Sequence, residues 1–229
     1  ALVKCGATFV NSITEIAKKS HVVISSVQNG QQVKEICLGK KGLFAHAKPD
    51  DLLFIDCSSI DIVTTVMLHD EAHKRRIGML DAPVSGGVAA ANAANLTIMV
   101  GGTESDFKRA LPILKHLGKK VIHAGPAGHG QAAKICNNLL LGISMIGVSE
   151  AFSLAEKLGL DPKKFFEISS NASGQCWSMT NYCPVPNIIE NVPSNNDYKP
   201  GFMANMMLKD LKLGMHAAET VDAEIPLGA

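Results

Sequence analysis

The sequence is poor in aromatic residues and has almost no net charge. Aromatic residues make up only 5% of its 229 positions, so a packed core must be built mainly from aliphatic side chains. The 22 basic residues nearly cancel the 21 acidic ones, which argues against a nucleic-acid binder that relies on a broad positive field. With 46% hydrophobic residues, the chain is too apolar for intrinsic disorder. Its length of 229 residues gives room for one large domain or two modest ones.

The sequence also lacks disulfide, metal and targeting signals. Its six cysteines form no C-x-x-C motif and no regular framework, which predicts reduced thiols in an intracellular compartment. No basic segment followed by an apolar run opens the chain, so we expect neither a signal peptide nor a membrane span. His69 and His73 lack the Glu of a zinc-hydrolase motif, and no other histidines show metal-ligand spacing. We therefore expect no metal, no nucleic-acid partner and no membrane partner.

Short apolar runs alternate with amphipathic segments in the first half of the chain. The expected strands are 21–26, 52–56, 79–81, 96–100 and 120–123. The expected helices between them are 12–19, 61–74 and 105–117. This alternation predicts an α/β fold with a mostly parallel sheet. The strands are almost continuously apolar, as is typical of a sheet covered on both faces.

The second half of the sequence is helical in pattern. A long apolar helix is expected over 131–158, and Asp161 followed by Pro162 predicts the N-cap and first residue of another helix. A loop-rich stretch, 171–201, precedes a last helix over 208–220. We place the domain boundary near residues 125–130, which gives an α/β domain over 1–127 and a helical domain over 128–229.

Lys134 is the most informative single residue. From residue 131 to residue 149 it is the only charged residue in a helix that is apolar on nearly every side, and such a helix is normally buried. A buried ammonium group is costly, so this lysine is expected to lose its proton or to find partners. Asn138 lies one turn further on the same face, and the two side chains could together orient a substrate and transfer a proton. A lysine that lies along the surface with its amine in water remains the alternative.

Two glycine-containing segments could hold a ligand. The segment 125–130 permits close backbone approach, and the first helical turn after it offers N–H groups to an anion. The segment 81–87 follows a strand, and its Ser85, Gly86 and Gly87 could hold a carboxylate. An ordinary tight turn explains these last three residues equally well.

Two further polar pairs have simple interpretations. Ser58 and Ser59 follow a strand and precede a helix, so N-capping is their most direct role and a cofactor contact the less direct one. Lys209 and Asp210 lie at the start of the last helix, where an isolated ion pair on a solvated face is the default interpretation.

Four motifs, taken in order, resemble those of the β-hydroxyacid dehydrogenase family. They are DAPVSGG at 81–87, NLTIMVGG at 95–102, GHGQAAKICNN at 128–138 and KD at 209–210. They span nearly the whole chain, and four ordered motifs are far more specific than any one of them. The segment SGQCWS at 173–178 resembles the hydroxyisobutyrate branch of this family.

The resemblance implies a fold and an activity. The fold would be a Rossmann-like, mostly parallel sheet whose N-terminal strands are missing from the chain, joined by a long helix to an all-α domain. The activity would be oxidation of 3-hydroxyisobutyrate to methylmalonate semialdehyde with NAD, a step of valine degradation. The family also implies a homo-oligomer, dimer or tetramer, in the mitochondrial matrix of a eukaryote or otherwise in the cytoplasm.

The resemblance also implies roles for particular residues. Lys134 would be the catalytic residue. The substrate would be bound by Ser85, Gly86, Gly87 and Asn138. The cofactor would be contacted by Ser26, Val27, Gln31, Ser59 and Lys209.

The sequence departs from the family pattern in several places. Ala89 and Ala94 stand where glycine is usual, and Gln175 stands where Arg is common. The glycine fingerprint and the acidic residue that separates NAD from NADP would precede residue 1, and roughly the last helix would follow residue 229. Two alternatives therefore stay open. One is a relative that acts on another short hydroxy acid, as tartronate semialdehyde reductase does, and the other is a non-catalytic assembly module without the cofactor fingerprint.

Overall fold

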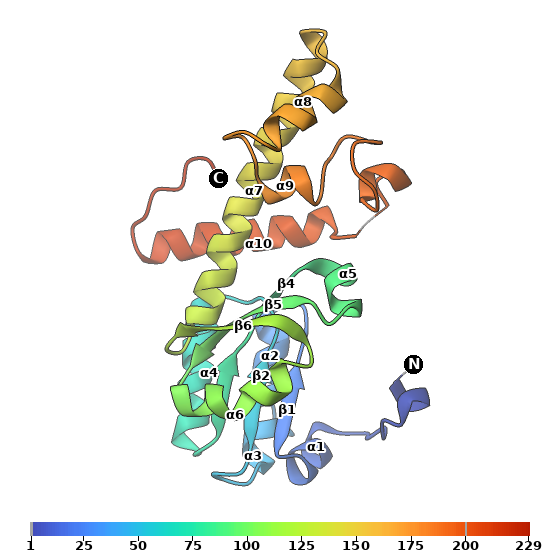
Figure 1. Cartoon of the computed structure of the whole chain (residues 1–229). Coiled ribbons are helices and arrows are strands. Elements are labelled where there is room, and N and C mark those ends of the chain that lie inside the picture. Colours follow the sequence, from blue (N-terminus) through green and yellow to red (C-terminus); the bar gives the residue numbers. More distant parts are fainter. Residues whose placement is uncertain (1, 200) are drawn as a thin grey trace. The chain divides into compact units, whose positions relative to one another are not determined.

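The structure is a computed structural model that describes residues 2–199 and 201–229. The chain divides into two units, Ala1–Lys134 and Ile135–Ala229, which are described separately below. The 29-residue helix α7 (His129–Lys157) begins in the first unit and continues into the second (Figure 1).

The first unit is built on a six-stranded sheet. Its strands are β1 (Val22–Ser25), β2 (Leu53–Asp56), β3 (Gly78–Asp81), β4 (Val84–Ser85), β5 (Leu96–Gly102) and β6 (Gly118–Gly125). The strand order is β1-β2-β3-β5-β4, and β6 also pairs with β5. Strands β1, β2 and β3 are parallel to one another, as are β5 and β6, whereas β5 is antiparallel to β3 and β4. The predicted α/β fold with a parallel-rich sheet is therefore confirmed.

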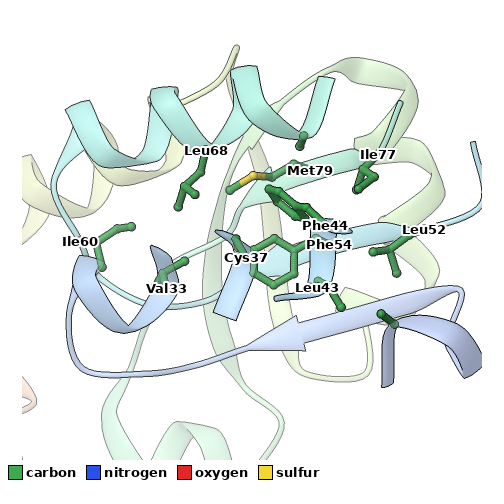
Figure 2. Close-up of a cluster of buried hydrophobic side chains, with 12 residues drawn as sticks. Val33, Cys37, Leu43, Phe44, Leu52, Phe54, Ile60, Leu68, Ile77 and Met79 are labelled. Carbon is green, nitrogen blue, oxygen red and sulfur yellow. The ribbon is translucent and has the colours of Figure 1, made fainter. Parts of the chain in front are cut away.

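Strand β2 shows why the strands read as continuous apolar runs. All four of its residues are buried, and successive side chains of a strand point to opposite faces of the sheet. Phe54 joins a cluster with residues of α1 to α4, which Figure 2 shows, and packs edge-on against Phe44 at a ring-centroid distance of 5.8 Å. Leu53 and Ile55 join a second cluster that includes residues of α6. Two cores thus cover the two faces of one sheet.

Four helices of the first unit, α1, α2, α4 and α6, begin at a polar residue whose side chain caps the helix. The helices are α1 (Ile13–Lys19), α2 (Gly30–Leu38), α3 (Leu43–His46), α4 (Ile62–Lys74), α5 (Gly87–Asn92) and α6 (Glu104–Leu114). Asp61 caps α4, because its carboxylate accepts a hydrogen bond from the backbone N–H of Thr64 at 2.7 Å. The interpretation of Ser58 or Ser59 as the N-cap of this helix is therefore wrong.

The second unit contains the greater part of α7 and several shorter elements. These are α8 (Pro162–Ser169), α9 (Trp177–Thr180), the 3₁₀ helix η2 (Pro193–Asn196) and α10 (Ala204–Thr220). Asp161 caps α8 with Pro162 at its first position, as predicted. A small core forms around Val148, Phe152 and Met179.

Helix α7 is long enough and apolar enough to cross a membrane, as judged by its length and composition alone. Its most apolar window has a mean hydropathy of 1.5, and 28% of that window is buried. A core helix of a water-soluble protein has the same length and composition, so this property carries little weight by itself. The expected absence of a membrane partner stays a prediction.

Candidate active site

The loops that follow β1 and β2 are joined by a hydrogen bond. Strands β1 and β2 are parallel neighbours in which Ser25 is paired with Asp56, so their carboxyl ends lie at the same edge of the sheet. The hydroxyl of Ser58, just after β2, accepts a hydrogen bond from the backbone N–H of Val27 at 2.9 Å. Two of the loops expected to contact a cofactor are thereby held together.

Asp56 links the ends of β1 and β2 through hydrogen bonds. Its Oδ1 accepts hydrogen bonds from the hydroxyls of Ser25 at 2.7 Å and Ser58 at 2.6 Å, whereas its Oδ2 is buried with no hydrogen-bond partner among the described residues. Burial raises the pKa of Asp56, the hydrogen bonds from both serines oppose that rise, and the charge of Asp81 adds to it. A chain of hydrogen bonds therefore runs from the backbone N–H of Val27, through the hydroxyl of Ser58, to the buried carboxyl group of Asp56.

The candidate cofactor contacts of the first unit provide uncharged hydrogen-bonding groups. Ser26 is exposed and Val27 half-buried after β1, Gln31 is exposed in the first turn of α2, and Ser59 is half-buried after β2. Hydroxyl, amide and backbone groups of this kind suit the ribose and carboxamide of a nicotinamide nucleotide, at the edge where open α/β sheets bind such ligands. The residues present at this edge thus fit the nicotinamide end of NAD.

Asp81, the last residue of β3, caps the start of α7. The carboxylate is fully buried, and it accepts hydrogen bonds from the backbone N–H groups of Gly128 and Gln131, both at 2.9 Å. His69 Nε2 lies 3.0 Å from the same carboxylate. The sequence suggested that the N–H groups of this turn are free to bind an external anion. For Gly128 and Gln131 that interpretation is wrong, because both N–H groups donate to Asp81. The protein supplies the anion itself.

Two glycines allow the close contact between Asp81 and α7. A Cβ atom on Gly101 would lie 2.6 Å from Asp81 Oδ1 and 2.6 Å from the backbone nitrogen of Gly130. A Cβ atom on Gly130 would lie 2.5 Å from the backbone oxygen of Asp81. Packing against Asp81 therefore accounts for both glycines.

The side chain of Gln131 connects the start of α7 to the loop after β2. Gln131 is fully buried; its Nε2 donates to the backbone oxygen of Ser58 at 2.7 Å, and its Oε1 accepts from the backbone N–H of Ile60 at 3.2 Å. The two hydrogen bonds bracket Ser59. No role for Asp81 or Gln131 was predicted from the sequence. The only indication of their importance was that they lie in the motifs 81–87 and 128–138.

Lys134 lies three residues after Gln131 in α7 and is 9% exposed. This burial agrees with the expectation drawn from its apolar helix and does not fit a lysine that lies along the surface with its amine in water. Its catalytic role stays a prediction.

The turn after β4 is exposed and depends on glycine. Ser85 ends β4 opposite Thr97 of β5, and Gly86 and Gly87 follow with φ of +136° and +70°. Such backbone angles favour glycine, and a Cβ on Gly86 would also lie 2.5 Å from the Cβ of Ala90. The turn itself therefore explains both glycines, and carboxylate binding by these residues stays a prediction.

In the second unit, Asn138 is held by Asp210 of α10. Asn138 is 1% exposed; its Nδ2 donates to Asp210 Oδ2 at 2.6 Å, and its Oδ1 accepts from Asn137 at 3.0 Å. Lys209 Nζ lies 3.0 Å from Asp210 Oδ1. The expected ion pair is therefore present, but Asp210 is only 6% exposed, so the expectation that the pair lies on a solvated face is wrong. The residue that orients the Asn138 amide was not identified from the sequence.

Among residues 2–199 and 201–229, no group of three or more His, Cys, Asp or Glu side chains is placed to hold a metal ion.

Comparison with known proteins gives matches along nearly the whole chain. Residues 1–125 match the family described as the NAD binding domain of 6-phosphogluconate dehydrogenase. Residues 128–229 match the family described as NAD-binding of NADP-dependent 3-hydroxyisobutyrate dehydrogenase. A Dictyostelium discoideum protein named probable mitochondrial 3-hydroxyisobutyrate dehydrogenase is 43% identical over 223 residues, which cover 97% of this chain and 69% of the relative.

L-serine appears in the names of two further similar proteins. A Pseudomonas aeruginosa protein named NAD-dependent L-serine dehydrogenase is 41% identical over 228 residues, which cover 100% of this chain and 76% of the relative. The solved structure of Mycobacterium tuberculosis 3-hydroxyisobutyrate dehydrogenase with L-serine has a TM-score of 0.90 and 43% identity, and covers 96% of this chain and 74% of that one.

A parallel-rich sheet followed by a helical unit, with these matches, defines an NAD-binding oxidoreductase. More particularly, the chain belongs to the 3-hydroxyisobutyrate dehydrogenase family. This membership favours an enzyme over the non-catalytic assembly module considered from the sequence.

Proposed function

We propose that the protein oxidises 3-hydroxyisobutyrate to methylmalonate semialdehyde with NAD, in the degradation of valine. The observation that carries the proposal is the burial of Lys134 near the start of α7, where Gln131 hydrogen-bonds the candidate cofactor loop after β2. The names of relatives at 42–43% identity support the choice of substrate.

Lys134 is the proposed general base. When bound, the nicotinamide supplies the hydride acceptor. The carbinol C–H bond breaks as its hydride leaves, the O–H proton passes to the amine of Lys134 or to the proton network it belongs to, and a carbonyl forms. Removal of that proton in step with hydride loss avoids a build-up of charge on carbon. The buried position of Lys134 keeps this proton transfer away from bulk water.

Binding of the substrate carboxylate is assigned to Ser85, Gly86 and Gly87. The hydroxyl of Ser85 and the backbone N–H groups of the two exposed glycines are donors that suit an anion. Asn138 is assigned to the substrate hydroxyl, and Asp210 keeps its amide in one orientation. Ser26, Val27, Gln31, Ser59 and Lys209 are assigned to the cofactor.

The test compares Lys134→Ala with Lys157→Ala. Both lysines lie in α7, but Lys157 is exposed at its C-terminal end and serves as the matched control. Loss of the base should lower kcat for 3-hydroxyisobutyrate at least about a hundredfold, measured by the absorbance of reduced nicotinamide. NADH binding, measured by its fluorescence, should persist in both variants. A Lys134→Ala enzyme with most of its activity would overturn the assigned role.

L-serine is the second candidate substrate. It is also a three-carbon chain with a carboxylate and a primary alcohol, and it occurs in the names of a 41% identical relative and of a similar solved structure. Competition between L-serine, 3-hydroxyisobutyrate and glycerate separates the candidates by their kcat/KM ratios. A kcat/KM for L-serine or glycerate that exceeds that for 3-hydroxyisobutyrate would overturn the proposed substrate.

We also propose that the protein forms a homo-oligomer, either a dimer or a tetramer. Leu140, Ile146 and Leu154 of α7 are 65%, 55% and 59% exposed, which is a high apolar exposure for three residues of one helix. Light scattering on the purified protein measures the mass directly, and a monomer would contradict the proposal. Relatives include a eukaryotic protein named mitochondrial and bacterial proteins, so the proposed compartment is the mitochondrial matrix in a eukaryote and the cytoplasm otherwise.

A further inference from the structure

Gln131 is fixed at both its backbone and its side chain. Its backbone N–H donates to Asp81 Oδ2 at 2.9 Å, and its side-chain amide uses both ends on the loop after β2. The residue is fully buried, so water does not compete for these hydrogen bonds. A buried amide with matched partners at both ends has one favourable orientation, with the oxygen toward Ile60 N and the nitrogen toward Ser58 O.

The partners of Gln131 lie on either side of Ser59. Gln131 bonds the carbonyl of Ser58 and the N–H of Ile60, so it constrains the backbone on both sides of Ser59. Ser58 and Ile60 lie 73 and 71 residues before Gln131 in the sequence. Ser58 is itself bound to Asp56 and to the N–H of Val27. The amide of Gln131 therefore holds the loop after β2 directly, and Ser58 links that loop to the one after β1.

Gln131 and Lys134 occupy neighbouring places on one helix face. Residues three apart in an α-helix lie on the same side, about 4.5 Å apart along the axis. A displacement of the first turn of α7 would therefore move Lys134 together with Gln131. Hydride transfer is sensitive to errors of about 1 Å in the placement of reacting groups, so this register matters for the rate.

We propose that Gln131 is a positioning residue, which sets the register between the base Lys134 and the cofactor loop at Ser59. The proposal rests on the proposed function, because it takes Lys134 as the base and Ser59 as a cofactor contact. It assigns to Gln131 no contact with either reactant. Loss of the amide would leave both reacting groups present but misaligned, which lowers kcat more than it weakens substrate binding.

The test uses Gln131→Met, which keeps the length of the side chain and removes both hydrogen bonds. We expect kcat to fall at least about tenfold while the KM for the hydroxy acid changes less than about threefold. Hydrogen exchange at the Ile60 amide should become faster, since its acceptor is lost. The control is Ser194→Ala, which removes another buried hydrogen bond, to the carbonyl of Cys183, and should leave kcat unchanged.

A second variant covers the case in which Gln131→Met fails to fold. Gln131→Glu retains an acceptor for Ile60 N but places an oxygen against the carbonyl of Ser58, so kcat should again fall at least about tenfold. Wild-type kcat in a folded variant that has lost protection at Ile60 would overturn the proposal. An equal loss of kcat in Ser194→Ala would also overturn it, because the effect would then be one of general stability.

The two proposals fail in different ways. If Lys134→Ala is inactive and Gln131→Met has a normal kcat, the positioning role is wrong and the base assignment stands. If Lys134→Ala is active, the base assignment is wrong, and the positioning role that depends on it is wrong as well.

Discussion

Asp81 accepts a hydrogen bond from the backbone N–H of Gln131 at 2.9 Å, although 50 positions of sequence separate the two residues. A second N–H, that of Gly128, binds the same carboxylate, and His69 lies against it. A buried carboxylate at the start of a helix satisfies unpaired N–H groups and interacts favourably with the helix dipole. The end of β3 and the start of α7 are thereby joined by charge-assisted hydrogen bonds.

Replacement of Asp81 by Asn should destabilise the protein. The amide nitrogen would face a backbone N–H and leave at least one buried donor unpaired, and the negative charge at the helix start would be lost. We expect a decrease of about 2–4 kcal/mol in the free energy of unfolding. Urea denaturation measures it, with Asp70→Asn on the exposed side of α4 as the control. Equal stability of the two variants would contradict the role assigned to Asp81.

The buried carboxyl group of Asp56 predicts a pH dependence. Burial raises its pKa in the folded protein, so the folded state holds this proton more tightly than the unfolded chain does. As pH rises from the ordinary value of 3.8 through the folded pKa, ionisation of Asp56 costs stability. The stability of the wild type relative to Asp56→Asn should therefore fall as the pH rises above 3.8. Urea denaturation of both proteins measures the difference, and an increase with pH would contradict the prediction.

Ala94 adopts a backbone conformation that favours glycine. It has φ of +50° just after α5, where the N–H of Asn95 donates to the carbonyl of Ala90 at 2.7 Å, as in a Schellman helix end. Ala94→Gly should raise the free energy of unfolding by about 1 kcal/mol, because it relieves left-handed strain at an alanine.

The matched control for Ala94→Gly is Ala89→Gly. Ala89 lies inside α5 with right-handed backbone, so glycine there should lower stability by about 0.5–1 kcal/mol. Thermal unfolding of the two variants should shift in opposite directions, and a shift of the same sign would contradict the assignment of strain to Ala94.

The cysteines should differ in reactivity toward alkylating reagents. Cys5 and Cys136 are exposed, whereas Cys37 is buried and Cys57 half-buried. Burial raises the pKa of Cys57 to about 12 and that of Cys37 as well, so at neutral pH these two carry almost no reactive thiolate. Mass spectrometry after brief treatment with iodoacetamide should find label on Cys5 and Cys136 before Cys57. Early labelling of Cys57 would contradict the prediction.

The sequence predicts the long and strongly patterned elements well. Strand 52–56, helix 61–74 and helix 131–158 were expected from their apolar patterns, and the structure places β2, α4 and α7 there within two residues of the expected ends. The capping pair Asp161 and Pro162 also fixes the start of α8. These elements are predictable because their stabilising features lie within one stretch of sequence.

Short elements escaped prediction, as did the pairing of β5. Helix α3 has four residues and strand β4 has two, too few to establish a periodic pattern. The antiparallel pairing of β5 with β3 and β4 depends on the path of the chain in space, which local pattern does not encode.

The candidate site was predictable in part. An isolated charge in an apolar helix was enough to single out Lys134 as buried. The partners that organise its surroundings were not predictable, because Gln131 meets Ile60 across 71 positions and Asn138 meets Asp210 across 72. Buried hydrogen bonds of this range leave no periodic trace in one sequence.

Gly101 and Gly130 have a consequence for how freely this protein can diverge. At each position even the smallest side chain would collide with Asp81 or with the backbone beside it, so the prohibition comes from packing and exists before any ligand arrives. A randomised library selected only for folding, with no demand for turnover, should still return glycine at both positions. Glycines shared by such sequences would then record steric exclusion rather than chemistry.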